Sequence, residues 1–138
     1  MSLKEANSTL ISVISLIIAI SALGYNTWRN EVSEHNRNIR ASGFELLKAS
    51  AKLQLLVDRQ FYEDNSQASP IEGWTRINFI VALSQVMPEP VKTNGVRLKA
   101  TWSENWQSLN ISEDANKAIS TANKQLETSI TAALAALN

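Results

Sequence analysis

His35 is the only histidine, and no other side chain in the sequence is an ordinary general base near neutral pH. A Ser–His–Asp relay would have to use it. Glu31, Glu34 and His35 also have helical spacing, so they could offer three metal ligands on one stretch of helix. Neither arrangement has a diagnostic spacing, and a solvated or helix-seam position is the ordinary explanation of His35. We therefore expect no catalytic site here.

Other chemistry-bearing motifs are weaker. Glu63, Asp64 and Asn65 could offer oxygens to Ca²⁺, but they lack the glycine and the distal glutamate of an EF-hand loop. Cysteine is absent, which excludes disulfides, a thiol nucleophile and a thiolate metal site. No glycine-rich phosphate loop is present. The sequence predicts a protein that is not an enzyme and that needs no metal or cofactor.

The charge balance argues against nucleic-acid binding. Thirteen basic and thirteen acidic side chains give a formal net charge of zero, whereas a nucleic-acid partner needs a basic face. Arg29, Arg37 and Arg40 could contact anionic lipid headgroups, but Glu31 and Glu34 lie among them. Recognised polybasic clusters hold about 4–8 cations. We expect these arginines to anchor the chain at a membrane.

One apolar stretch near the amino end must organise the rest of the chain. Leu10–Tyr25 contains no charge, proline, asparagine or glutamine. A helix over residues 9–28 would be roughly 30 Å long, about the thickness of a bilayer's hydrocarbon core, and Trp28-Arg29 suits its boundary with water. After a short tail at 1–8, we predict one transmembrane helix at 9–28. Its lipid-facing residues would include Leu10, Ile11, Ile14, Ile17, Ile18, Ile20, Leu23, Tyr25 and Trp28.

Two alternatives remain for this stretch. It could be the central core helix of a wholly soluble bundle, with residues 10–25 buried, in a ligand-binding or dimerisation module. It could also be a cleaved signal peptide, although its n-region has only Lys4 beside Glu5. A helix that is hydrophobic all round needs lipid or a large core, and the remaining 110 or so residues are few for wrapping it. The transmembrane reading is therefore preferred.

Small and polar side chains follow one face of the predicted transmembrane helix. In lipid, small residues let two backbones approach closely and let hydroxyl groups bond across the contact. We expect self-association or docking on a partner membrane protein through this face, although serine and alanine are tolerated in any transmembrane helix. The face consists of Ser8, Ser12, Ser15, Ala19, Ala22 and Asn26.

A second row of mostly apolar residues continues beyond the predicted membrane boundary at the period of a coiled-coil seam. It predicts a long amphipathic helix that continues the transmembrane helix to about residue 62. Gly43 is where we expect a break, because glycine costs about 1 kcal/mol inside a helix. The row is Ile11, Ile14, Ile18, Ser21, Tyr25, Trp28, Val32, His35, Ile39, Ser42, Leu46, Ala49, Leu53, Leu56 and Gln60.

Three shorter helices are predicted after residue 68, so the domain at 29–138 is an all-α bundle of about four helices, near 29–62, 71–87, 94–109 and 113–137. Ser69-Pro70-Ile71-Glu72 reads as a capping box. Thr93 or Asn94 can cap the third helix, and Ser112 the fourth. Two prolines, Pro88 and Pro90, end the second. No strand pattern is present.

Large aromatic rings are numerous for so small a bundle. They could line a pocket for a small apolar or aromatic molecule, or they could be the core itself. Core is the favoured reading. The rings are Trp74, Phe79, Trp102 and Trp106. Val96, Leu98 and Leu109 belong to the same predicted third helix as Trp102 and Trp106.

Together these features predict a non-enzymatic, single-pass membrane protein that acts through helix–helix association, as an accessory subunit, a sensor-like module or a scaffold. The plan is similar to that of many small bacterial inner-membrane proteins with one N-terminal span, and no motif-defined family is indicated. Arg29, Arg37 and Arg40 outnumber Lys4, so the positive-inside bias places the bundle on the cytoplasmic side.

Overall fold

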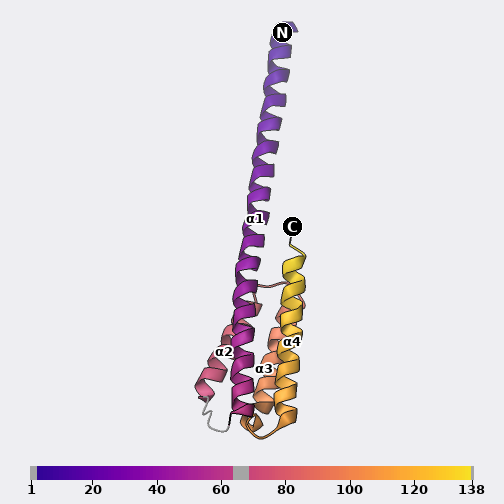
Figure 1. Ribbon diagram of the computed structural model, residues 1–138. Coiled ribbons are helices and arrows are strands. Elements are labelled where there is room, and N and C mark those ends of the chain that lie inside the picture. The colour runs from indigo at the N-terminus through magenta and orange to yellow at the C-terminus, as the bar shows by residue number, and fades with distance from the viewer. Residues whose placement is uncertain (1–2, 64–68, 138) are drawn as a thin grey trace. The chain divides into compact units, whose positions relative to one another are not determined.

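A computed structural model describes residues 3–63 and 69–137 of the chain. This part is all-helical and contains no strand, which confirms the predicted all-α bundle. Figure 1 shows the order of the elements along the chain. They are α1 (Leu3–Tyr62), α2 (Pro70–Ser84), α3 (Val91–Asn105), the short 3₁₀ helix η1 (Trp106–Ser108) and α4 (Glu113–Ala135).

The chain divides into two compact units between Arg37 and Asn38. We call the first the N-terminal unit and the second, Asn38–Asn138, the bundle. Helix α1 contributes to both units, since it is one helix from Leu3 to Tyr62. It begins earlier than the predicted start at residue 9, because residues 3–8 contain no proline or glycine and Glu5 favourably meets the positive end of the helix dipole.

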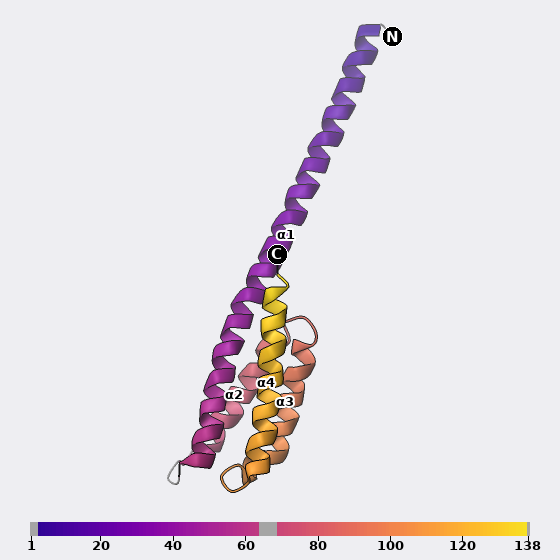
Figure 2. The same cartoon turned by 45° about the vertical axis from the view of Figure 1, so that its right-hand side comes forward.

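The bundle encloses an apolar core to which α2, α3, α4 and the C-terminal part of α1 contribute buried side chains. Figures 1 and 2 show α4 beside both α3 and the C-terminal part of α1. Removing these side chains from water is the main favourable term in the bundle's stability. The buried cluster is Ile39, Leu46, Ala49, Leu53, Leu56, Val57, Ile77, Ile80, Met87, Val91, Leu98, Trp102, Leu109, Ile119, Ala122, Leu126 and Ile130.

Gly43 does not break α1, contrary to the sequence-based expectation. It is buried against Leu134 of α4, and a Cβ atom on Gly43 would lie 2.7 Å from Leu134 Cδ2. The missing side chain therefore allows α1 and α4 to approach closely. Tertiary packing outweighs the low helix propensity of glycine at this position.

The predicted capping box at the start of α2 is wrong in its side-chain bonds. Pro70 does occupy the first turn, but the Ser69 side chain makes no capping hydrogen bond. The Ser69 carbonyl instead accepts the Glu72 amide at 2.9 Å, and the Glu72 carboxylate pairs with Arg76. A backbone turn thus satisfies the helix end that the hydroxyl was expected to serve.

Helices α2 and α3 are both displaced toward the amino end relative to the predicted bounds. Helix α2 ends at Ser84, and the turn to Met87 is closed by short-range bonds such as Met87 N to Ser84 O at 3.2 Å. Helix α3 begins at Val91, so neither Thr93 nor Asn94 caps it. The Glu89 carboxylate instead accepts hydrogen bonds from the Thr93 amide and hydroxyl, at 3.2 and 2.9 Å.

Helix α4 follows the sequence pattern closely. The Ser112 hydroxyl caps its first turn by accepting the Ala115 amide at 3.2 Å, as predicted. Glu113 and Asp114 in that turn complement the helix dipole. Ile119, Ala122, Leu126 and Ile130 recur at helical spacing and form a buried stripe along α4.

Candidate functional site

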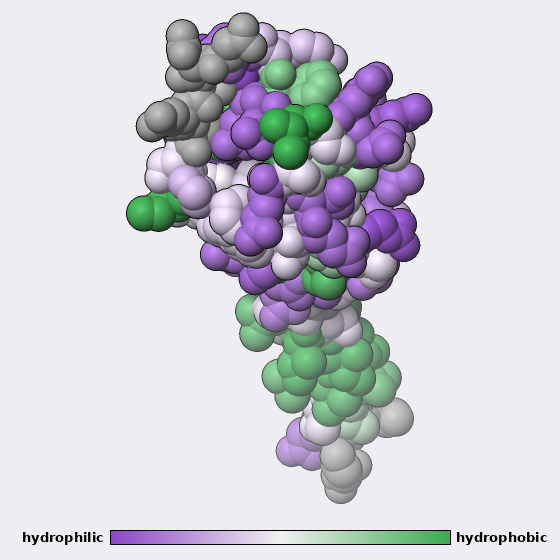
Figure 3. Space-filling model, turned by 90° about the horizontal axis from the view of Figure 1, so that it is seen from below, coloured by the Kyte–Doolittle hydropathy of each residue, from purple (hydrophilic) through white to green (hydrophobic). Residues whose placement is uncertain are grey.

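The apolar stretch of α1 is exposed along its whole length. Among the described residues, α1 is the one helix long and apolar enough to cross a membrane, with an 18-residue window of mean hydropathy 2.0 that has no buried residue. Figure 3 shows this apolar surface (green) gathered on the narrow N-terminal part of the chain, whereas the visible face of the bundle is mostly hydrophilic. Exposed fractions run from 47% to 69% for Leu10, Ile11, Ile14, Ile17, Ile18, Ile20, Leu23, Tyr25 and Trp28.

Several polar side chains in and beside this stretch are satisfied within the helix. The Ser12 hydroxyl donates to the Ser8 carbonyl, and that of Thr27 donates to the Leu23 carbonyl, both at 3.0 Å. Thr9 bonds the Glu5 carbonyl in the same way. Such back-bonding removes most of the cost of placing a hydroxyl in hydrocarbon, where water offers no partner. These three hydroxyl groups therefore need no partner outside the helix.

An aromatic pair marks the C-terminal end of the apolar stretch. The rings of Tyr25 and Trp28 lie 6.1 Å apart between centroids, with 46° between their planes. Arg29 follows directly in the sequence. Rings with a polar edge next to a cation are the group expected at headgroup level.

The small-residue row remains uncovered in the structure. All six of its members, Ser8, Ser12, Ser15, Ala19, Ala22 and Asn26, are exposed on α1. Helical spacing places them on one side of the helix, as the sequence predicted. The row is available for contact with another helix.

The candidate catalytic and metal residues gain no support from their surroundings. His35, Glu31 and Glu34 are all exposed on α1. No group of three or more histidine, cysteine, aspartate or glutamate side chains within the described residues could hold a metal ion. Glu63 is exposed, while Asp64 and Asn65 lie outside the described residues. Arg29, Arg37 and Arg40 are exposed, as a lipid contact would require.

Three tryptophans form one aromatic cluster in the bundle. Trp74 meets Trp102 and Trp106 edge to face, at centroid distances of 6.5 and 6.3 Å. Trp102 is 1% exposed and belongs to the buried core, and the other two rings pack against that core. Gly73 lies directly under the Trp102 ring, where a Cβ atom would collide with it. Trp102 is thus a core residue, and Trp74 and Trp106 lie half-buried beside it.

Phe79 lies apart from the other aromatic residues. It is exposed on α2 and lines an open groove of about 260 Å³ between α1 and α2. Lys48 donates a 2.7 Å hydrogen bond to Glu45 at this groove and lowers the pKa of that carboxyl, with a smaller effect from Lys52. Two of the charged side chains that line it, Lys48 and Arg76, are paired with Glu45 and Glu72 across one turn of their own helices.

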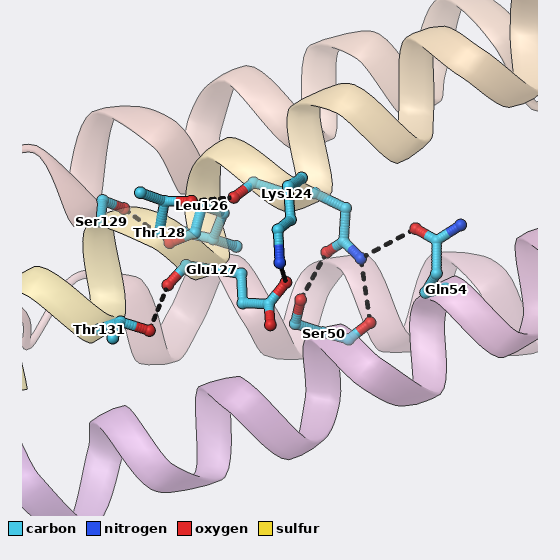
Figure 4. Close-up of polar contacts among 9 residues, drawn as sticks. Ser50, Gln54, Lys124, Leu126, Glu127, Thr128, Ser129 and Thr131 are labelled. Atoms are coloured by element: carbon cyan, nitrogen blue, oxygen red, sulfur yellow. Dashed lines mark hydrogen bonds and ion pairs between the residues drawn. The ribbon is translucent and has the colours of Figure 1, made fainter.

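The polar contact between α1 and α4 was not predicted from the sequence. Ser50 donates to Asn123 Oδ1 at 2.9 Å, and Asn123 Nδ2 donates to the Ser50 carbonyl at 3.0 Å and to Gln54 Oε1 at 3.3 Å. Figure 4 shows Ser50 and Gln54 of α1 on the side that faces α4. Ser50 and Asn123 are almost completely buried. The sequence did contain one signal for this contact: Asn123 lies four residues after Ile119, which places it on the buried stripe of α4.

Comparison with known proteins adds no family to this description. No protein-family model, no curated protein and no solved structure matches the chain.

Proposed function

We propose that the chain is a non-enzymatic, single-pass membrane protein that holds a small helical bundle at the membrane and acts through helix–helix association. The observation that carries this proposal is the exposure of the apolar stretch. Its 18-residue window has a mean hydropathy of 2.0, and none of its residues is buried. So much apolar surface on a soluble monomer would be unusual, and hydrocarbon is the surrounding that suits a helix apolar on every side.

The bundle supports the same proposal because its core needs no help from this stretch. All the buried core side chains, from Ile39 to Ile130, lie in the second unit. A central core helix at residues 10–25 would instead be covered by its neighbours. The exposure of Leu10–Tyr25 therefore favours a membrane span over the soluble alternative.

The proposed working surfaces are faces of α1. The small-residue row from Ser8 to Asn26 suits a close approach by the span of a partner membrane protein or of another copy. The chain would then serve as an accessory subunit, a sensor-like module or a scaffold. The arginines after Trp28 favour a cytoplasmic bundle under the positive-inside rule.

Fractionation of cells expressing the full chain tests the anchor. We expect the protein in the membrane pellet in the absence of detergent, with an intact mass that retains residues 1–25. Full-length protein in the supernatant would instead support the soluble bundle. A chain shortened at its amino end would identify a cleaved signal peptide. A reporter fused after Asn138 then gives the side of the membrane that the bundle occupies.

The small-residue row is tested by replacing two of its small side chains with large ones. Replacing Ser15 and Ala19 by leucine should lower the size of the complex in mild detergent, because the backbones could no longer approach. The matched control replaces Ile17 and Ile20 by leucine, which preserves side-chain volume and should leave the size unchanged. A complex of unaltered size in the Ser15→Leu/Ala19→Leu variant would exclude the row as a contact.

A further inference from the structure

A second exposed row lies on α1 just beyond the apolar stretch. We call Tyr25, Trp28, Val32 and His35 the membrane-proximal row. Steps of three, four and three residues place them on one side of the helix, at the period of a two-stranded coiled coil. Tyr25, Trp28 and Val32 are 59%, 61% and 42% exposed, and His35 is exposed too. Two large rings and a valine thus face outward in the N-terminal unit.

The charges around this row are arranged for pairing. At about 100° per residue, Arg29 and Glu31 lie on opposite flanks of the row, while Glu34 and Arg37 lie on the far side of the helix. Neither Arg29 nor Glu31 makes an ion pair with any residue that the structure describes. The row itself contains no lysine, arginine, aspartate or glutamate. This is the layout of a coiled-coil seam with one charged position on each flank.

We propose that a second copy of the chain pairs with the membrane-proximal row as a parallel coiled coil, with Arg29 of each copy beside Glu31 of the other. In a parallel pair, each flank of one helix faces the opposite flank of its partner, so the two charges of unlike sign meet on both sides. In an antiparallel self-pair, arginine would face arginine and glutamate would face glutamate. The charges of one copy therefore match those of a second copy only when the two helices are parallel.

This inference rests on the proposed function, because a shared membrane span supplies that orientation. Copies anchored by the same segment have parallel helices and stand at the same depth, so their rows meet in register. His35 places a polar imidazole in the row, and a polar group in a seam favours one register. The membrane-proximal row lies about 100° around the helix from the small-residue row, so the two contacts can be tested separately.

Disulfide trapping tests the seam, since the natural chain has no cysteine. Val32→Cys in the full chain places one thiol on the row, and the control Asn30→Cys places one on the opposite side of the helix. A disulfide needs Cα atoms within about 7 Å. Under mild oxidation of membranes, Val32→Cys should be converted mostly to a dimer of twice the chain mass, and Asn30→Cys should remain at background.

Each other outcome of the trapping contradicts a stated claim. Equal dimer from both variants, or a membrane-bound Val32→Cys chain that stays monomeric, would overturn the seam and leave the anchor intact. A cross-linked product of another mass would assign the row to a different protein. A chain found in the supernatant would overturn the proposed function, and the seam with it.

Charge reversal tests the orientation. Arg29→Glu and Glu31→Arg should each weaken dimerisation in detergent by about tenfold, because like charges then meet on both flanks. The double variant restores opposite charges and should recover most of the affinity. Glu34→Arg, on the far side, is the matched control and should change little. A double variant as weak as the two single variants combined would contradict the parallel pairing.

Discussion

The N-terminal unit and the bundle contain similar kinds of apolar residues, but these residues are exposed in the first and buried in the second. In the bundle, Leu46, Leu53 and Leu126 are fully buried. In the N-terminal unit, Leu10, Leu16 and Leu23 are at least 59% exposed. Hydrophobic character alone therefore does not place a side chain in a core; it must also face another apolar element of the same chain.

Helix α1 shows where this difference arises, since it belongs to both units. After residue 38 it has a stripe, with Ile39, Leu46 and Leu53 buried and Lys48 and Lys52 exposed. A stripe can be covered by neighbours such as α4. Between Leu10 and Tyr25, α1 carries no charge, and no residue of its most apolar 18-residue window is buried. The stripe is buried by the other helices of the bundle, whereas the apolar stretch of the N-terminal unit is exposed.

The largest expected effect comes from removing one of the two units. Deleting residues 1–25 should move the protein from membranes to the supernatant and leave a folded helical bundle, because every core residue is retained. Fractionation and far-ultraviolet circular dichroism measure the two results. Loss of helical signal and of cooperative melting in the truncated chain would show that the apolar stretch belongs to the fold of the bundle.

A matched pair of leucine substitutions sharpens the comparison. Leu126→Ala should lower the free energy of unfolding of the bundle by about 2–5 kcal/mol, because it leaves a cavity in the core. Leu16→Ala should change it by less than about 0.5 kcal/mol, because Leu16 is 60% exposed and its truncation leaves no cavity in the core. Thermal melts of the full chain in detergent give both values. Equal losses from the two variants would remove the distinction between the units.

The glycines offer a second pair. Gly73→Ala should cost about 1–3 kcal/mol, because the new methyl group would collide with the Trp102 ring. Gly24→Ala meets no atom within 4 Å and should leave the bundle's stability unchanged. Denaturant titration followed by tryptophan fluorescence measures the change. A Gly73→Ala variant as stable as the parent would mean that Trp102 has room to move.

The smallest of these effects concerns the polar contact between α1 and α4. Asn123→Ala should destabilise the bundle by about 1–2 kcal/mol, because it leaves the buried Ser50 hydroxyl without its acceptor. Thr121→Ala, exposed on the same helix, is the control. The same denaturant titration applies. An Asn123→Ala variant indistinguishable from Thr121→Ala would mean that water replaces the lost hydrogen bonds.

The fold could be predicted from the sequence where the signal was local and periodic. Residue spacing indicates both the buried stripe of α4 and its Ser112 cap. It also places Pro70 in the first turn of α2. The start of α3 at Val91 was not predicted. The Glu89 carboxylate, which precedes the helix, accepts hydrogen bonds from Thr93, and helix propensities do not include such a contact. Membership of the third helix also did not show which of its apolar residues are buried: Val96 is 54% exposed, whereas Leu98 and Trp102 are buried.

Features that depend on a partner far along the chain were missed. Gly43 looks like a weak point of the helix in the sequence, but in the structure Leu134 packs closely against it. Likewise, only the structure shows that the Trp102 ring occupies the space where a side chain at Gly73 would lie. Ser50 and Asn123 lie far apart in sequence, so their pairing has no local signature. The apolar stretch is the opposite case. It was recognised at once because its signal is its own composition.

Thiol labelling in membranes tests most directly whether hydrocarbon surrounds the apolar stretch. Ile20→Cys and Asn30→Cys each place one thiol in a chain that otherwise has none. With a water-soluble maleimide on lysed membranes, the account predicts labelling of Asn30→Cys at once and of Ile20→Cys only after denaturation. Equal labelling of both thiols before denaturation would show that water reaches residue 20 and would contradict the membrane span.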